Sequence, residues 1–194
     1  MPDSLTREAV VPRLRGRFGR EYLYAERCPS TQRLIPPDAP EGTVAVAEEQ
    51  TEGRGRLNRR WEAKAGTSVL CSVLLRPQVD PARLPELTLV GARACAAAIE
   101  ELAGLEPALK DPNDVLVGGR KVAGVLGEAS EGRVVLGIGI NANATAEELP
   151  RATRLPATSL RAELGTPVDR AELLVLLLER LERQYEAWLR DVDR

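Results

Sequence analysis

The chain has 194 residues, 43% of them hydrophobic and 29% charged, which fits one soluble globular domain with a sizeable core. It contains no histidine, which excludes serine–histidine–aspartate and cysteine–histidine catalysis and any zinc site with histidine ligands. A net charge of −2 excludes the basic excess of a dedicated nucleic-acid-binding protein.

The chain carries no signal for export or membrane insertion. No apolar run reaches the roughly 18 residues of a membrane span, and the acidic N-terminus has no signal-peptide core. Cys28, Cys71 and Cys95 are odd in number and lack CxxC spacing, so we expect buried free thiols rather than a disulfide or metal site. These features favour a cytoplasmic protein without a membrane contact.

The first half of the chain predicts a short helix, three strands and one cationic loop. A turn with a proline-rich connector separates the first two strands, and Ser30 and Thr31 stand at a possible helix start within that turn. The expected ranges are 4–17 for the helix, 22–25, 43–47 and 68–75 for the strands, and about 50–66 for the loop.

The second half predicts two helices around a group of strands. Apolar residues at near-helical spacing predict a helix over 84–102 that Gly104 ends. Two adjacent glycines within 114–123 predict a β-hairpin. A strand over 133–140 and an amphipathic helix over about 174–188 follow.

Grouped strands with helices between and after them predict an α+β fold. We expect a mixed, largely antiparallel sheet with helices packed mainly on one face, in a single domain over residues 1–194. The regular alternation of a Rossmann fold is absent, and neither GxGxxG nor a P-loop motif is present.

The cationic loop is the first candidate for a ligand site. Gly53 and Gly55 flank Arg54 and permit close backbone approach, and five cationic residues face one acid between positions 53 and 64. A solvated arginine-rich loop is the alternative interpretation. Trp61, one of two tryptophans, lies in this polar stretch and favours a site that closes over a ligand ring.

The predicted hairpin is the second candidate. Asp114 could hold Mg²⁺ on a triphosphate, or Asn113 and Asp114 could form an Asx turn that shapes the strand entry. Lys121, just past the turn, is either a solvated charge or an anion-binding group. Ser30 and Thr31 are similarly open between a helix cap, the favoured interpretation, and donors to a polar ligand head.

Six short motifs in order make the chain resemble the catalytic domain of biotin protein ligases, whose fold is like that of class II synthetases. They are Ser30-Thr31-Gln32; Gln50 with Gly53-Arg54-Gly55-Arg56 and Trp61; Ser72 with Leu75-Arg76-Pro77; Lys110 with Pro112-Asn113-Asp114; Lys121 with Ala123-Gly124-Val125-Leu126 and Glu128; and Gly137-Ile138-Gly139-Ile140-Asn141. Gly137-Ile138-Gly139 is expected at a strand end.

The resemblance implies ATP-dependent activation of biotin to biotinyl-5′-AMP, followed by transfer to a lysine of biotin carboxyl carrier protein. ATP and Mg²⁺ would be the co-substrate and ion, with no tightly bound prosthetic group. A carboxylate and an incoming amine are adequate nucleophiles, so positioning and charge neutralisation can supply most of the catalysis.

The resemblance also implies roles for individual residues. The catalytic residues would be Lys121, Arg54 and Arg56. The biotin site would comprise Ser30, Thr31, Gln32, Gln50, Gly53, Arg54, Gly55, Arg56, Lys121 and Gly124. The ATP site would comprise Arg56, Trp61, Asn113, Asp114 and Asn141, with Asp114 also a ligand of Mg²⁺.

Three departures from the family pattern bear on these expectations. Asp111 replaces the usual tryptophan before the proline, and Asn58 stands where many members have glycine. The chain ends after the closing helix, where the family's small C-terminal β domain would begin. The residues before Tyr22 are too few for the helix-turn-helix of some members, so we expect no DNA binding.

Other functions and assemblies remain open at this stage. A lipoate or octanoyl ligase shares the fold but has a glycine-rich signature that is absent here. A biotin or biotinyl-AMP-binding protein with impaired transfer is the second alternative, and RNA binding through the arginine loop is the third. A homodimer formed through a sheet edge is possible.

Overall fold

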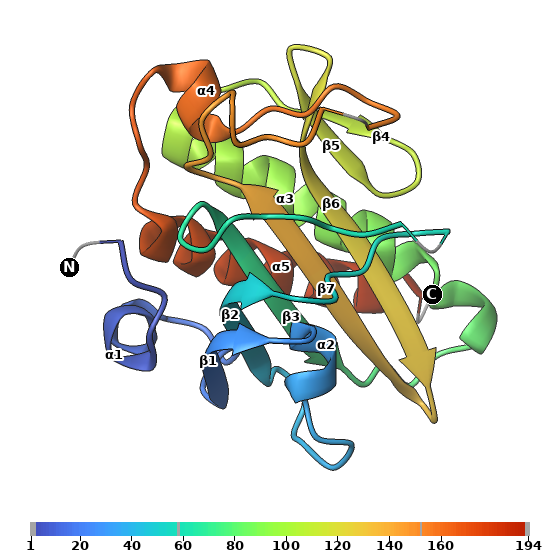
Figure 1. Cartoon of the computed structure of the whole chain (residues 1–194). Helices are drawn as coiled ribbons and strands as arrows, with labels where there is room; N and C mark the ends of the chain where they lie inside the picture. The colour runs from blue at the N-terminus through green and yellow to red at the C-terminus, as the bar shows by residue number, and fades with distance from the viewer. Residues whose placement is uncertain (1–2, 58, 152, 193–194) are drawn as a thin grey trace.

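The structure is a computed structural model that describes residues 3–57, 59–151 and 153–192. Within these residues seven strands form one sheet in the order β1-β2-β3-β7-β6-β5-β4 (Figure 1). The strands are β1 (Tyr22–Cys28), β2 (Val44–Gln50), β3 (Ser68–Leu75), β4 (Ala108–Lys110), β5 (Asp114–Val117), β6 (Arg120–Ser130) and β7 (Arg133–Asn141). β1 and β2 are parallel and the remaining neighbours antiparallel, which confirms the expected mixed, largely antiparallel sheet.

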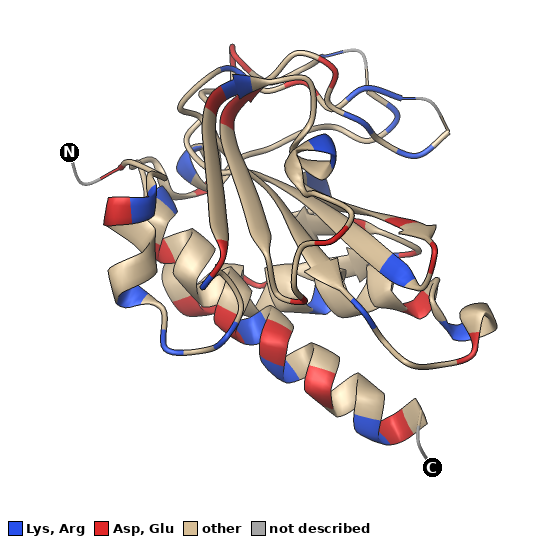
Figure 2. Ribbon diagram, turned by 90° about the horizontal axis from the view of Figure 1, so that it is seen from below, with Lys and Arg blue, Asp and Glu red and all other residues tan. Residues whose placement is uncertain are grey.

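Two long helices cover one face of this sheet. The helices of the described residues are α1 (Arg7–Val10), α2 (Thr31–Leu34), α3 (Glu86–Ala103), α4 (Leu160–Leu164) and α5 (Arg170–Val192). α3 and α5 lie side by side behind the sheet, whereas the short α2 lies on the front (Figure 1). Charged residues are spaced along α5, while the central strands are largely uncharged (Figure 2). The expected α+β arrangement, with helices mainly on one face, is confirmed.

The alternation of β7 determines what each face of the sheet presents. Leu136, Ile138 and Ile140 are buried in the main core with α3 and α5. Their neighbours at 137, 139 and 141 point to the front because successive side chains of a strand alternate. The expectation that Gly137 and Gly139 stand at a strand end is wrong, since both lie inside β7.

Several element boundaries differ from the expected ones. The first helix is shorter than expected, because Pro12 follows α1 within a 3-10 turn over Val11–Arg13. β1 and β2 each run three residues further than predicted. Gly118 and Gly119 have φ of 56° and 75° and form the predicted hairpin turn.

Two further expectations concern cysteines and membrane contact. All three cysteines are buried free thiols, as expected. In the parts of the chain that the structure describes, no helix combines the length and apolarity needed to cross a membrane.

Candidate active site

A pocket of about 980 Å³ lies on the front of the sheet, opposite α3 and α5. Described residues of the loop after β2 and of a second loop, among them Pro150, Arg151, Thr153 and Ala157, line it. It is lined by every predicted site residue except Gly53: Ser30, Thr31, Gln32, Gln50, Arg54, Gly55, Arg56, Trp61, Asn113, Asp114, Lys121, Gly124 and Asn141. Gly53 lines a smaller hollow on the other side of the arginine loop. Asn58 lies outside the described residues.

The floor of the pocket is backbone rather than side chain. Gly124 of β6 pairs with Gly139 of β7, and Leu126 pairs with Gly137, so these four residues face the front together. A Cβ at Gly139 would lie 2.5 Å from Trp61 Cε2, and one at Gly137 would lie 3.1 Å from Gln32 Cδ. The glycines therefore allow the Trp61 ring and the Gln32 side chain to pack directly against the sheet, and together with these two side chains they line a slot of the pocket.

A polar cluster lies where α2 meets β2 and β3. The Oε1 atom of Gln50 accepts hydrogen bonds from the Thr31 backbone N–H at 2.7 Å and from Thr31 Oγ1 at 3.2 Å. Thr31 Oγ1 also lies 2.7 Å from Ser72 Oγ. These bonds orient the Gln50 amide so that, among the described residues, its Nε2 donors remain available to a ligand.

The favoured interpretation of Ser30 and Thr31 as a helix cap is wrong for their side chains. Ser30 occupies the N-cap position of α2 but makes no side-chain capping bond, and Thr31 is used by the polar cluster. Gln32 donates from Nε2 to the carbonyls of Leu126 and Val135 and thereby joins α2 to the two central strands.

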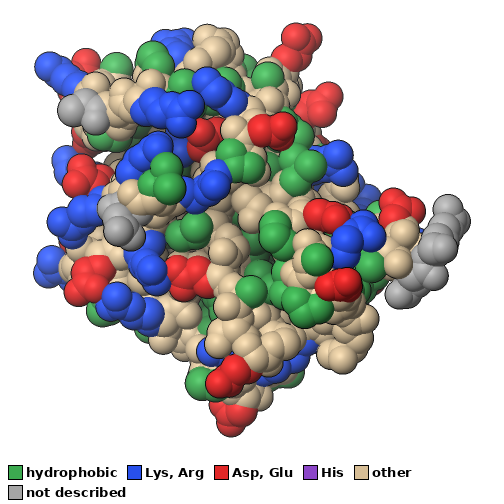
Figure 3. Space-filling view, turned by 90° about the vertical axis from the view of Figure 1, so that its right-hand side faces the viewer, with side chains coloured by type: hydrophobic (Ala, Val, Ile, Leu, Met, Phe, Trp, Pro, Cys, Tyr) green, Lys and Arg blue, Asp and Glu red, His purple; other side chains and the backbone are tan. Residues whose placement is uncertain are grey.

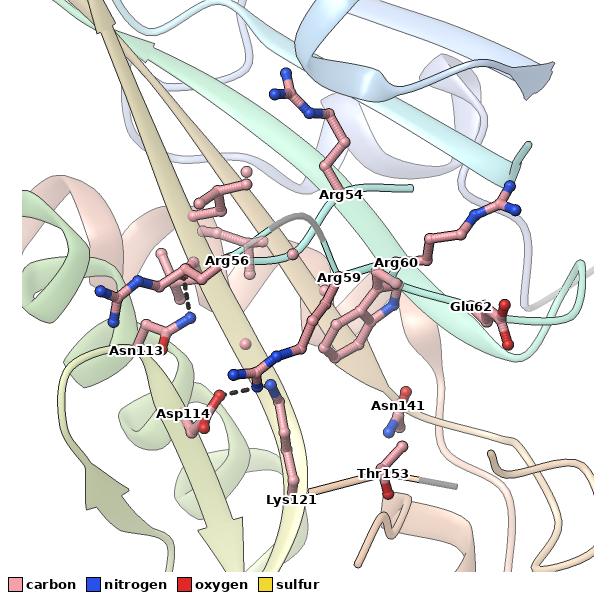
Figure 4. Close-up of a pocket in the computed structure, with 18 of the residues that line it drawn as sticks. Arg54, Arg56, Arg59, Arg60, Glu62, Asn113, Asp114, Lys121, Asn141 and Thr153 are labelled. Carbon is pink, nitrogen blue, oxygen red and sulfur yellow. Dashed lines mark hydrogen bonds and ion pairs between the residues drawn. The ribbon is translucent and has the colours of Figure 1, made fainter. Parts of the chain in front are cut away.

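The arginine loop is folded back on itself. The Gly55 N–H donates to the Arg59 carbonyl at 2.8 Å and the Trp61 N–H to the Gly53 carbonyl at 3.0 Å. A Cβ at Gly53 would collide with the Trp61 carbonyl oxygen, so glycine is required there. Arg54 forms an ion pair with Glu128 of β6 at 2.6 Å. Figure 4 shows the four arginines of the loop extending in different directions, with Arg59 toward Lys121.

Lys121 is held from the backbone side by residues far along the chain. Its N–H donates to the Pro156 carbonyl at 2.7 Å, and its carbonyl accepts from Thr158 N–H at 2.8 Å. Its Nζ lies 2.5 Å from Asp114 Oδ1 and 5.4 Å from the centroid of the Trp61 ring. Lys121 therefore points into the pocket and is not a solvated charge (Figure 4).

Both asparagines of the predicted ATP site also support the fold. Asn113 Nδ2 donates to the Val125 carbonyl at 2.9 Å, so the side chain bridges to β6 and the Asx turn considered from the sequence is not formed. Asn141 Nδ2 donates to the Thr158 carbonyl at 3.0 Å. The roles of both residues toward a nucleotide remain predictions.

The chemistry of the pocket is that of charge and positioning. Cys71 borders it, but burial raises the pKa of this thiol to about 12, so it is protonated at neutral pH and unsuited to nucleophilic attack. Among the described residues no group of three or more His, Cys, Asp or Glu side chains could hold a metal ion. A cation at Asp114 would therefore need most of its ligands from a bound polyanion.

Eight cationic side chains and three carboxylates line the pocket, although the whole chain has a net charge of −2. In the space-filling view, Lys and Arg side chains gather toward the left-hand side, with some acidic side chains between them (Figure 3). Four of these arginines were given no role from the sequence: Arg59 and Arg60, which were counted only as part of the cationic loop, and Arg151 and Arg154, which were not predicted at all. Arg151 and Arg154 follow Pro150 outside the regular helices and strands. Two arginines so close together in sequence were the available indication of a second cationic segment.

Residues 24–144 match the family model described as "Biotin/lipoate A/B protein ligase family". The Bifunctional ligase/repressor BirA of Bacillus subtilis is 39% identical over 181 residues, covering 89% of this chain and 56% of that protein. The Biotin--[acetyl-CoA-carboxylase] ligase of Mycobacterium tuberculosis is 38% identical over 154 residues, covering 76% of this chain and 56% of that protein. The chain thus spans little more than half the length of these relatives.

Solved structures of biotin protein ligases from other organisms resemble the fold of this chain. The biotin protein ligase from Aquifex aeolicus in complex with biotin and ATP superposes with a TM-score of 0.78 at 36% identity, covering 86% of this chain and 71% of that chain. The biotin protein ligase from Leishmania major in complex with biotinyl-5-AMP, at 22% identity and a TM-score of 0.71, shares the fold.

Proposed function

Because this chain belongs to the biotin/lipoate A/B protein ligase family, we propose that it activates biotin with ATP and transfers the biotinyl group to a lysine of biotin carboxyl carrier protein. The observation that carries this proposal is the glycine-floored slot, with the Thr31–Gln50–Ser72 cluster on one side and the Lys121 ammonium on the other. An elongated ligand with a polar ring system and a carboxylate matches that arrangement.

The polar cluster suits the ureido group of biotin. A urea presents two N–H donors and one carbonyl acceptor, and the cluster offers hydroxyl oxygens and an oriented amide. Gly124, Gly137 and Gly139 line the same pocket and add no side chain of their own beside Trp61 and Gln32, where the apolar ring and chain would lie. The arm then leads the carboxylate toward Lys121, whose Nζ would lie 3.1 Å from a Cβ at Gly124.

In the first step a biotin carboxylate oxygen attacks the α-phosphorus of ATP. The new O–P bond forms as the bond from that phosphorus to the bridging oxygen breaks, and pyrophosphate leaves with the electron pair. The cationic excess of the pocket offsets the charge of the triphosphate and of the leaving pyrophosphate. We assign Lys121, Arg54 and Arg56 to the reacting carboxylate and phosphates.

Trp61, Asn113, Asp114 and Asn141 stay assigned to ATP. The buried Oδ1 of Asp114 has the chemistry of an Mg²⁺ ligand, and the ion would neutralise phosphate charge when bound. In the second step the carrier amine attacks the acyl carbon, AMP leaves, and the amine loses a proton.

The wider predictions from the sequence also stand as proposals. They are one catalytic domain over residues 1–194, a cytoplasmic location consistent with three free thiols, and no contact with DNA or membranes. A homodimer formed through a sheet edge is likewise a proposal.

The decisive experiment offers biotin and lipoate separately with ATP and Mg²⁺ and follows pyrophosphate release, with binding measured by titration calorimetry. Release with biotin and not with lipoate supports the proposal, whereas release with lipoate alone overturns it. A carrier-protein arm completes the test. Tight biotin binding without carrier biotinylation would support a binding protein with impaired transfer instead.

Substitution of Lys121 by alanine tests the assignment of the reacting end. We expect pyrophosphate release to fall by about a hundredfold, because one oriented cation at the developing charge is removed. Circular dichroism should still show a folded chain, with some loss of stability because Asp114 loses its partner. Lys64→Ala is the control, since Lys64 does not line the pocket and pairs with Glu148. A Lys121→Ala rate within threefold of the unmodified chain would contradict the role, because the activation free energy would then have changed by about 0.7 kcal/mol or less.

A further inference from the structure

Lys121 has a carboxylate partner in the empty pocket. Asp114 opens β5 and Lys121 is the second residue of β6, so the β5–β6 hairpin brings them together. Nζ and Oδ1 are 2.5 Å apart, and the two side chains are only 27% and 18% exposed. Asp114 Oδ1 is buried and has no hydrogen-bond partner among the described residues, so the Lys121 ammonium is its compensating group.

The lysine can leave this partner without any change in the backbone. Its main chain is fixed on both sides by Pro156 and Thr158, whereas the flexible side chain lies between the Asp114 carboxylate and the face of Trp61. Rotation of the side chain is therefore enough to move the ammonium from Asp114 to a ligand carboxylate in the slot. The ammonium has three N–H donors, but one is engaged by Asp114, and the negative charge of Asp114 disfavours a second carboxylate beside the same ammonium.

We propose that Asp114 is a positioning residue that withholds Lys121 from the ligand carboxylate in the nucleotide-free pocket and releases it when another cation takes its place. The inference rests on the proposed function. Its physical reason is that a buried carboxylate left without a partner is strongly unfavourable. Departure of Lys121 is therefore coupled to arrival of positive charge at Asp114, for which a divalent ion with the nucleotide is the suited candidate.

This arrangement couples the two ligands energetically. Binding of the metal–nucleotide complex strengthens the contact of Lys121 with the biotin carboxylate. By linkage, bound biotin strengthens binding of the complex to the same extent. An Asp114→Asn chain lacks the competing charge. Its Lys121 is free in the empty pocket, so biotin should bind more tightly without nucleotide and gain less when the nucleotide is added.

The experiment measures biotin affinity by calorimetry on the full chain, without nucleotide. We expect Asp114→Asn to bind biotin about three- to tenfold more tightly than the unmodified chain, the range of a partly exposed ion pair. The matching alcohol of biotin, which has no carboxylate, should show no such gain. Asp111→Asn removes the same charge from the same pocket without touching the pair, so the gain in Asp114→Asn must exceed its effect by at least about threefold.

Two further arms isolate Lys121 and the cation. In a Lys121→Met background, Asp114→Asn should give no gain, because no ammonium is left to release. Adding Mg²⁺ with a non-hydrolysable ATP analogue should tighten biotin binding in the unmodified chain by a larger factor than in Asp114→Asn. A gain that persists without Lys121, an equal gain for the alcohol, or no gain at all overturns the proposal.

A ligand-independent readout keeps this result separate from the proposed function. Modification of Lys121 by an amine-reactive reagent, followed by peptide mass spectrometry, should be faster in Asp114→Asn than in Asp111→Asn. Equal rates overturn the pairing even if biotin binds. Absence of biotin binding to the unmodified chain, with the difference in rate intact, counts against the proposed function and leaves the ion pair supported.

Discussion

Gly124, Gly137 and Gly139 place bare backbone at the centre of a sheet whose other central positions carry Val, Leu and Ile. All three face the front, where a side chain would collide with Trp61, Lys121 or Gln32, while their neighbours in sequence point back into the core. Alternate residues of β6 and β7 thus have different functions. The back-facing residues stabilise the domain, and the front-facing ones leave room for a ligand.

Substitution of Gly139 by alanine tests this division. The new methyl group would lie 2.5 Å from Trp61 Cε2, so the indole must move into the slot or out of it. We expect biotin affinity to fall about tenfold, with a folded sheet, because alanine itself is compatible with a strand. Calorimetry gives the affinity and circular dichroism the fold.

Gly127→Ala is the matched control for that change. Gly127 lies on β6, the strand next to Gly139 of β7, but a Cβ there would meet Thr88 of α3 at 3.3 Å rather than the pocket. Its biotin affinity should stay within about twofold of the unmodified chain. Similar losses in both variants would mean that the central strands, and not the slot, respond to the added methyl group.

At the scale of elements, the arginine loop is attached to the sheet mainly at its base. Within the loop, hydrogen bonds join Gly53 to Trp61 and Gly55 to Arg59, while the Arg54–Glu128 ion pair and the Trp61 ring connect the loop to β6. Both side chains of that pair are more than a third exposed, so the link is weak enough to open for ligand entry. A loop that acts as a lid and closes over a ligand ring, as Trp61 favours, needs such an attachment.

Glu128→Gln should loosen this lid. Because an exposed ion pair contributes about 0.2–1 kcal/mol, we expect trypsin to cleave at the loop arginines about two- to fivefold faster. Mass spectrometry of the early fragments locates the cuts. Glu49→Gln, which removes an exposed pair between β1 and β2, is the control and should leave loop cleavage unchanged. Unchanged cleavage in Glu128→Gln would show that the pair does not restrain the loop.

The elements differ in how well the sequence predicts them. β3, the glycine hairpin, α3 and α5 follow from long apolar patterns or a specific turn, because burial over many residues repeats the same signal. β4 consists of three residues, all exposed, and α4 is only five residues long. Neither is long enough for a hydrophobic period to show, so both were missed. Their positions depend on contacts distant in sequence.

The candidate site shows the same limit. Short motifs suffice to identify the residues on β2, β5, β6 and β7, because residue types and order carry that information. The bonds from Pro156 and Thr158 to Lys121 join segments far apart in the chain and follow no local pattern. For the same reason, nothing in the sequence predicts that Asn113 and Asn141 use their amides to support the fold.

At the scale of the whole molecule, charge is separated between the pocket and the rest of the surface. The pocket has an excess of cations while the chain is net acidic, and acidic residues are spread along α5 on the far side of the sheet. A polyanionic ligand is therefore attracted to the front face and not to the molecule as a whole. This distribution also explains why net charge alone gives no hint of an anion-binding site.

One buried arginine joins four segments of the molecule that are distant from one another in sequence. Arg170, whose side chain is 4% exposed, begins α5 and donates to Asp3 of the N-terminal segment, to Glu48 of β2 and to the Ser68 carbonyl of β3. Its Nη1 lies 2.6 Å from Glu48 Oε2, and the Glu48 side chain is only 16% exposed. Removal of the guanidinium would leave that carboxylate partly buried without its partner.

Arg170→Met should therefore lower the free energy of unfolding by about 3–5 kcal/mol, the usual loss when one member of a buried ion pair is removed. Urea denaturation followed by circular dichroism measures it. Arg13→Met, which removes exposed pairs with Asp169 and Glu172, should cost less than about 1 kcal/mol. In Arg170→Met/Glu48→Gln part of the loss should be recovered, because the uncompensated charge is gone. A loss below about 1 kcal/mol in Arg170→Met would mean that water reaches Glu48 and that α5 is held to the sheet by its apolar face alone.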